Sequence, residues 1–265
     1  MTTSDVSAAT TVYFTPLGGN KIALYSNSLW QQIFFSETSV AVPSTTTTPF
    51  DIFAYNNSGT LALEALSWSS DTARATALTT LNGIDVKSGD SSRRYLGTGR
   101  TTGSSGQTED STSKRFLWNR CNRLPRKLRA LSTSDTWDYT TATWRAANND
   151  TTTGVTRVEF VVGMQIEPLD LDGFVPGNHG STDTAVTIGI GINSTSANTS
   201  DVYGAQSTLG AYMGVLAHYN GYPGLGYSYA QWLEIALALG TVSWYTSSQS
   251  GGVQRQGGLT GEIWS

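Results

Sequence analysis

Charged side chains are scarce in this sequence: they make up 14% of its 265 residues, with 16 Lys and Arg against 20 Asp and Glu. A protein that coats nucleic acid normally carries a basic excess, so the formal net charge of −4 argues against that role. A single cysteine, Cys121, excludes an internal disulfide, so packing or oligomerisation has to stabilise the fold. With only His179 and His218, a histidine-based metal site or hydrolytic triad has few options.

Export signals and long hydrophobic runs are also lacking. Residues 1–11 are rich in Thr, Ser and Ala and contain neither the basic segment nor the apolar core of a signal peptide. The longest apolar stretch, Trp232–Leu239, is interrupted by Glu234 and is far shorter than the roughly 20 residues that cross a bilayer. We therefore expect a protein that is made in the cytoplasm, without membrane insertion.

The residues that are abundant favour β-structure. Hydrophobic residues reach 38%, enough to form a core, while Gly, Ser, Thr and Asn supply polar sheet surfaces and turns. Apolar residues occupy every second position from Val186 to Ile192, and one face of Tyr227–Leu239 is similarly apolar. A helix is the alternative for Tyr229–Leu239, but Gly226 and Gly240 bracket it, which favours a strand. The sequence predicts an all-β, jelly-roll-like β-sandwich, built either as one unit or as two β units in tandem, with one or two short helices.

Changes in composition divide the chain into four regions. The first is an extended arm that is either flexible or lies along a partner subunit, and the third is a helix with a basic connector. The predicted regions are 1–11 (N-terminal arm), 12–109 (N-terminal β region), 110–129 (helix and connector) and 130–265 (C-terminal β-sandwich).

Two segments carry helix signals. Asp110–Asn122 has an Asp or Ser cap and apolar residues at helical spacing, and Pro125 ends it. Trp68–Ala77 contains Ser and Asp ahead of Thr72, which predicts a short capped turn of helix.

Nearly half of the basic residues lie in one short segment, and two interpretations stay open. One is a docking patch for acidic groups of a partner protein or of lipopolysaccharide; the other is a solvated helix face whose Arg stems pack over Trp118 and Phe116. The residues are Lys114, Arg115, Arg120, Arg123, Arg126, Lys127 and Arg129.

Aromatic residues are numerous, with 8 Trp and 12 Tyr. Flat aromatic faces near Asn, Asp and Gln suit sugar stacking, although core or interface packing explains most such residues. The candidates for glycan contact are Trp137, Tyr139, Tyr219 and Tyr222.

Acidic residues offer two further alternatives. An acidic turn before Gly173 contains Glu167, Asp170 and Asp172. This turn either binds Ca²⁺ or is simply solvated, and the solvated alternative is favoured because the spacing of the carboxylates lacks the EF-hand pattern. A glycosidase pair drawn from Glu159, Glu167, Asp170 and Glu234 depends on a separation that sequence does not give. His179 is expected in an exposed loop and His218 in the interior or an interface. We predict no catalytic residue, no resident metal and no cofactor.

Short blocks of residues between Val12 and Arg123 follow one another in a distinctive order. They are Tyr13-Phe14-Thr15-Pro16, Gly19-Asn20, Leu24-Tyr25, Trp30, Phe50-Asp51-Ile52-Phe53, Tyr55-Asn56, Trp68, Ser70-Asp71-Thr72-Ala73-Arg74, Leu81-Asn82-Gly83, Tyr95-Leu96-Gly97-Thr98, Lys114-Arg115-Phe116-Leu117-Trp118-Asn119 and Asn122-Arg123. Together they resemble a group of tailed-phage and prophage virion proteins, generally tail-fibre, appendage or head-decoration components. The resemblance covers under half of the chain and brings no catalytic motif.

This resemblance implies a non-enzymatic structural component of a virion, commonly a homotrimer that contacts other head or tail proteins. Such a component is made in the host cytoplasm and released by lysis, and the basic segment would dock on acidic capsid or tail groups. Its identical weak surfaces would act together by multivalency. Two alternatives are a receptor- or carbohydrate-binding lectin-like module that contacts a host surface glycan, and a polysaccharide depolymerase.

Overall fold

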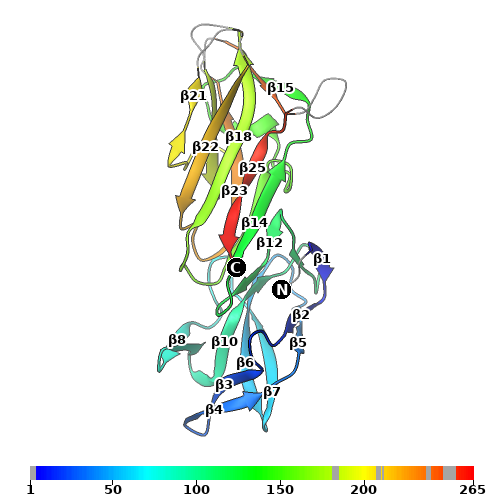
Figure 1. Cartoon of the computed structure of the whole chain (residues 1–265), viewed down its shortest axis with the longest axis vertical. Coiled ribbons are helices and arrows are strands. Elements are labelled where there is room, and N and C mark those ends of the chain that lie inside the picture. The colour runs from blue at the N-terminus through cyan, green and yellow to red at the C-terminus, as the bar shows by residue number, and fades with distance from the viewer. Residues whose placement is uncertain (1–3, 181–184, 207–209, 211, 237–239, 247–254) are drawn as a thin grey trace.

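The computed structural model describes residues 4–180, 185–206, 210, 212–236, 240–246 and 255–265, and it shows an elongated molecule made of β-strands (Figure 1). Strands hold 58% of the residues and helix only 1%, so the predicted all-β class is confirmed. The one helical element in the described part is a single 3₁₀ turn, η1 (Ala147–Asn149). No helix among the described residues is both long and apolar enough to cross a membrane.

Two sheets form a β-sandwich in the larger part of the molecule. The front sheet has the strand order β14-β25-β18-β22-β20, with β15 and β24 attached, and the back sheet has the order β1-β11-β12-β17-β23-β19-β21, with β16 attached. The front strands are β14 (Pro125–Leu131), β15 (Thr136–Tyr139), β18 (Leu169–His179), β20 (Val202–Tyr203), β22 (Met213–Gly221), β24 (Val242–Tyr245) and β25 (Gly258–Trp264). The back strands are β1 (Val6–Ala9), β11 (Thr108–Asp110), β12 (Lys114–Arg115), β16 (Arg145–Ala146), β17 (Arg157–Val162), β19 (Val186–Ile192), β21 (Ala205–Gln206) and β23 (Gly226–Ile235).

Side-chain alternation builds the core between these sheets. In β18, every second residue from Leu169 is buried, and the residues between them face outward. The apolar positions of β19 and β23 face the same core, where Trp232 and Trp244 are among the largest fully buried side chains. The strand predicted at Tyr229–Leu239 is therefore confirmed as far as Ile235, while residues 237–239 lie outside the described part.

A smaller part, formed by residues before position 120, holds a second core. Its strands are β2 (Thr11–Phe14), β3 (Lys21–Ser26), β4 (Leu29–Phe34), β5 (Thr38–Ala41), β6 (Pro49–Asn57), β7 (Thr60–Ser67), β8 (Leu78–Leu81), β9 (Ile84–Lys87), β10 (Asp90–Arg100) and β13 (Leu117–Asn119). The central sheet has the order β7-β6-β10-β9-β8, with β13 paired to β10. The β6–β7 hairpin turns at Ser58 and Gly59, both with positive φ, where the Asn56 side chain accepts a hydrogen bond from the Gly59 amide at 2.6 Å.

A third apolar cluster lies where the two parts meet. Phe53 and Tyr95 from the smaller part pack with Trp118 and with Val161 from β17 of the back sheet. The predicted N-terminal arm is extended and ends near this junction: β1 pairs with β11 of the same chain, and β2 pairs with β5 (Figure 1).

The helix predicted at Asp110–Asn122 is wrong. The segment forms the short strands β11, β12 and β13, and Ser111–Ser113 make a tight turn in which the Lys114 amide donates to the Ser111 carbonyl at 3.2 Å. Phe116 and Trp118 are buried two positions apart, as in a strand, so pairing with β10 and β17 overrides the local cap signals. Trp68–Ala77 is also not helical: the Ser70 hydroxyl accepts from the Ala73 amide at 3.1 Å in an isolated turn.

Candidate functional site

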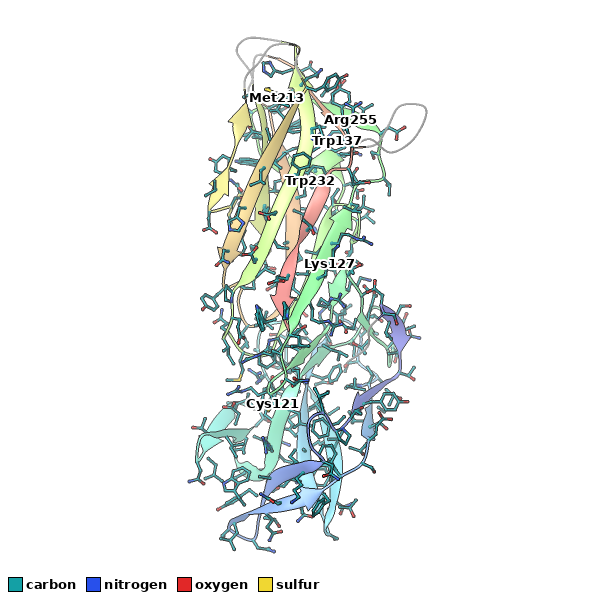
Figure 2. The ribbon with its side chains drawn as sticks, viewed as in Figure 1. Cys121, Lys127, Trp137, Met213, Trp232 and Arg255 are labelled. Carbon is teal, nitrogen blue, oxygen red and sulfur yellow. The ribbon has the colours of Figure 1, made fainter. Side chains whose placement is uncertain are left out.

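The basic segment is distributed over β12, the β13–β14 connection and β14, and most of it pairs with carboxylates of the same chain. Five of the seven predicted docking residues make ion pairs, so a continuous patch of free charge does not form. The alternative of a solvated helix face is wrong about the helix, because the segment forms strands, but the Arg123 guanidinium does lie over Trp118, 5.4 Å from the ring centre. The pairs are Lys114–Glu109 (3.2 Å), Arg115–Asp110 (3.1 Å), Arg120–Asp85 (2.6 Å), Arg123–Glu167 (2.9 Å) and Arg126–Asp110 (2.7 Å). Lys127 and Arg129 remain exposed on β14, and within the described residues neither side chain has an ion-pair partner (Figure 2).

Asp110 is the centre of the most buried of these pairings. Its two carboxylate oxygens accept from Arg115 and Arg126, and Arg115 also donates through Nε to the Lys127 carbonyl at 3.0 Å. The three charged side chains come from β11, β12 and β14, so the network joins the back sheet to the front sheet near the junction. Removing either arginine would leave part of the buried carboxylate without a partner.

A second charged network crosses the junction directly. Arg74 donates through Nε to Asp51 at 2.8 Å and through Nη2 to the Gly163 carbonyl at 2.5 Å, which links the loop after β7 to the residues that follow β17. Burial raises the pKa of Asp51, and the neighbouring Arg74 opposes that shift, as does the hydrogen bond from Thr98. Burial likewise raises the pKa of Tyr95, whose hydroxyl lies 3.4 Å from Arg74.

Arg100 makes a third contact between the two parts. Its guanidinium lies 3.6 Å from the centre of the Tyr227 ring on β23 and 3.3 Å from Asp71. Burial raises the pKa of Tyr227 to about 12. The backbones of the two parts also approach closely at this point, where the Tyr227 amide donates to the Asp71 carbonyl at 2.9 Å. Gly226, at φ +89°, permits this approach, because a Cβ there would overlap the Asp71 carbonyl oxygen.

Two of the four predicted glycan-contact residues are buried. Trp137, only 9% exposed, packs against Trp232 and Trp244 inside the sandwich, and its Nε1 donates to Glu234 at 2.5 Å (Figure 2). Tyr219 also lies in this core. No sugar can stack on either ring, and these two predictions are wrong because β-strand alternation turns both side chains inward.

The other two glycan candidates lie at opposite ends of the sandwich. Tyr139 is half-buried beneath the Arg145 guanidinium, and Tyr222 is 57% exposed just after β22. Tyr139 is on β15, which pairs with β24, and β24 pairs with the end of β18 at Gly177–His179. Tyr222 follows Gly221, which pairs with Leu169 at the other end of β18, and the 11 residues of β18 span roughly 35 Å at about 3.3 Å per residue. The four residues therefore do not form one site.

The carboxylates considered for glycoside hydrolysis are also separated. Glu234 is 0% exposed and accepts from Trp137, Arg145 and the Asn148 amide; burial raises its pKa to about 7, against the effect of these hydrogen bonds. Glu167 pairs with Arg123, and Glu159 accepts from Thr153. Glu159 and Glu234 belong to the back sheet and Asp170 to the front sheet. Glu159, Glu167 and Glu234 are thus each held by hydrogen bonds or ion pairs within the chain.

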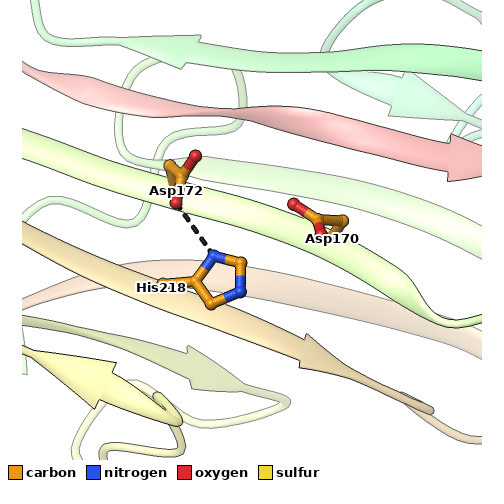
Figure 3. A group of neighbouring side chains, drawn as sticks. All are labelled: Asp170, Asp172 and His218. Carbon is orange, nitrogen blue, oxygen red and sulfur yellow. Dashed lines mark hydrogen bonds and ion pairs between the residues drawn. The ribbon is translucent and has the colours of Figure 1, made fainter.

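The predicted acidic turn is instead part of a strand. Asp170 and Asp172 both lie on the outer face of β18, while Glu167 precedes the strand and turns to Arg123. On β22, Asn220 pairs opposite Asp170 and His218 pairs opposite Asp172. The His218 Nδ1 lies 2.9 Å from the Asp172 carboxylate (Figure 3), and Asp170, Asp172 and His218 are the one group of described residues with the donor types and spacing for a metal ion.

The same outer face carries apolar side chains beyond these polar groups. Phe174, 43% exposed, follows Asp172 on β18, and Leu216 is opposite it on β22. Val202 on β20, opposite His218, extends this exposed apolar surface at the sheet edge, whereas Tyr203 is opposite the buried Ala217 and its ring contacts Trp144. His179, by contrast, is buried at the end of β18, so its predicted position in an exposed loop is wrong.

Two surface hollows lie elsewhere in the described part. One, of about 180 Å³, is lined by residues around Phe34 and Thr60, and the other, of about 380 Å³, lies between residues 72–78 and Met164 with Leu225. Neither is lined by a histidine or by two carboxylates.

Comparison of the chain with protein-family models, with curated proteins and with solved structures gives no match.

Proposed function

We propose that the chain is a non-enzymatic structural subunit of a tailed-phage particle, a fibre, appendage or head-decoration component that works as a homotrimer through repeated surface contacts. The sequence blocks between Val12 and Arg123 support this proposal, as does the elongated all-β shape. In such a role the protein is assembled into the virion, binds other head or tail proteins and needs no cofactor.

One observation carries the proposal: the few charged residues are used to brace the molecule internally. Arg74, Arg100 and the Asp110 network all lie at or across the junction between the two β parts. Burying such charges costs desolvation energy, and the attraction between the paired charges offsets this cost only when their geometry is fixed. A subunit that transmits force or holds a surface at a fixed distance from a particle requires such a fixed junction, whereas a soluble enzyme needs a recessed site.

The oligomeric state provides the first test. Light scattering after size-exclusion chromatography should give a mass near 85 kDa, three times the 28.3 kDa of one chain. A concentration-independent mass of a single chain, from the lowest to the highest usable concentration, would contradict the homotrimer and with it the multivalent mechanism.

A second candidate function is recognition of a host surface glycan, and the outer face of the front sheet favours it. Carboxylates, the Asn220 amide and the exposed ring of Phe174 lie on this face, which is the combination that sugar hydroxyls and the apolar face of a pyranose require. A glycan array detects this activity. A reducing-end assay on any bound polysaccharide then distinguishes a binding module, which leaves the polymer intact, from a depolymerase.

A further inference from the structure

We propose that Asp170, Asp172 and His218 form a binding site for a divalent transition-metal ion of the Zn²⁺ type on the outer face of the front sheet. One potential ligand atom from each residue lies within 4.8 Å of the other two. The inference stands apart from the proposed function, because it concerns the chemistry of three side chains and not the particle to which the chain belongs.

The two strands fix the positions of these side chains. Asp170 and Asp172 are two residues apart on β18 and so share a face, and His218 is directly opposite Asp172 on β22. Figure 3 shows the imidazole reaching across to the Asp172 carboxylate, with Asp170 beside it on the same strand as Asp172. Sites built on strands hold their geometry more precisely than sites on loops.

The observed spacing is close to that of a coordinated ion. With ligand bonds of about 2.0–2.2 Å and tetrahedral angles, two donors on one Zn²⁺ are roughly 3.4 Å apart. The His218 Nδ1 and an Asp172 oxygen are 2.9 Å apart, so an ion that replaces the shared proton separates them by only about 0.5 Å. The Asp170 oxygen lies within 4.8 Å of the other two donors, so it has to approach by at most about 1.4 Å.

The donor set selects the class of metal. Ca²⁺ and Mg²⁺ prefer oxygen ligands alone, and Ca²⁺ takes six to eight of them. One imidazole nitrogen with two carboxylates favours Zn²⁺ and its first-row neighbours, which accept nitrogen and oxygen together. His218 and Asp172 are partly exposed, so water can fill the remaining positions of the ion.

Neighbouring groups support the ligands. The side-chain amide of Asn220 donates to Asp170 at 2.9 Å. The backbone amide of Asn220 donates to Asp201 at 2.6 Å, which brings another carboxylate to this edge of the sheet. Such outer hydrogen bonds orient metal-binding carboxylates.

The carboxylates around the site are not held in ion pairs with basic residues, although Lys127 and Arg129 of β14 lie opposite Glu262 and Thr260 of β25 on the same face. Within the described residues, Asp170, Asp201 and Glu262 have no ion pair with Lys or Arg, unlike the carboxylates at the junction. The nearest basic strand, β14, is separated from β18 by β25. A cation therefore binds here without displacing an ion pair with Lys or Arg, and it takes the place of the proton in the His218–Asp172 contact.

Calorimetric titration of the chelator-treated full chain with Zn²⁺ tests the proposal. We expect saturable binding of one ion per chain, and loss of affinity by at least about tenfold in His218→Gln and in Asp170→Asn. Glu262→Gln is the matched control, because it removes the same charge as Asp170→Asn from the same face, one strand away, and should change affinity by less than about twofold. Circular dichroism confirms that each variant is folded.

Several results would overturn the inference. These are an absence of saturable Zn²⁺ binding by the wild-type chain at millimolar metal, unchanged affinity in His218→Gln, or an equal loss in Glu262→Gln and Asp170→Asn, which would indicate diffuse attraction to negative charge. Displacement of Zn²⁺ by equimolar Ca²⁺ would also contradict it, since the imidazole would then contribute nothing to selectivity.

Discussion

Replacing Arg74 with Met should loosen the junction between the two β parts. The substitution keeps an apolar stem against Trp68 and Tyr95 but removes the donors to Asp51 and to the Gly163 carbonyl. Asp51 is 1% exposed, so its carboxylate would remain buried without a charged partner, although the Thr98 hydroxyl would still donate to it. Breaking one partner of a buried ion pair typically costs 3–5 kcal/mol, and we expect the free energy of unfolding to fall by about that amount at pH 8.

The pH dependence gives this prediction a signature. Burial already raises the pKa of Asp51, and loss of Arg74 raises it further. A carboxyl group whose pKa is higher in the folded state than in the unfolded state stabilises the fold below its unfolded pKa, and this contribution is lost as the pH rises through the folded pKa. The defect of Arg74→Met should therefore shrink as the pH is lowered toward 4.

Urea unfolding followed by Trp fluorescence measures both effects. The double variant Arg74→Met with Asp51→Asn is the control: it has no buried charge to leave unpaired, so it should recover part of the lost stability. A loss below about 1 kcal/mol in the single variant, or fully additive losses in the double variant, would refute the view that this pair braces the junction.

Three further predictions follow from buried groups and from the basic segment. Glu234→Gln should flatten the pH dependence of the free energy of unfolding between about pH 4.5 and 7. Because burial raises the pKa of Glu234 to about 7, its stabilising contribution is lost as the pH rises through about 7, and urea titrations at several pH values measure this loss. Gly226→Ala should destabilise the fold by several kcal/mol or prevent folding, since its Cβ would overlap the Asp71 carbonyl at positive φ; thermal unfolding measures the change, and a shift below about 2 °C would contradict the packing. Lys127→Ser with Arg129→Ser should change stability by less than about 0.5 kcal/mol, whereas Arg126→Met should cost several times more, because Arg126 pairs with buried Asp110.

The fold class could be predicted from the sequence because its signal is local. Alternation in β19 and β23 and the turn signal at Asn56–Gly59 each depend on neighbouring residues. The same reasoning wrongly predicted a helix after Asp110, because a cap residue and apolar residues at mixed spacing are also compatible with a helix. Its strands are two and three residues long and exist because distant strands pair with them.

The site residues were harder to predict because their partners are remote in sequence. Arg120 pairs with Asp85 and Arg123 with Glu167, so a cluster of positive charge in the chain becomes a set of internal ion pairs in space. Trp137 has a suitable surface for a sugar but belongs to the core through Trp232, almost a hundred positions later. Asp170 and Asp172 were identified as candidate ligands, but His218 joins them only through the register of β18 with β22.

Electron cryo-microscopy of particles released by lysis of the host tests the central proposal most directly. The chain should appear on the particle exterior as elongated two-part densities, grouped around three-fold axes, with the junction in the same geometry in every copy. Purified particles that lack the polypeptide, with all of it recovered as free single chains in the lysate, would contradict the account.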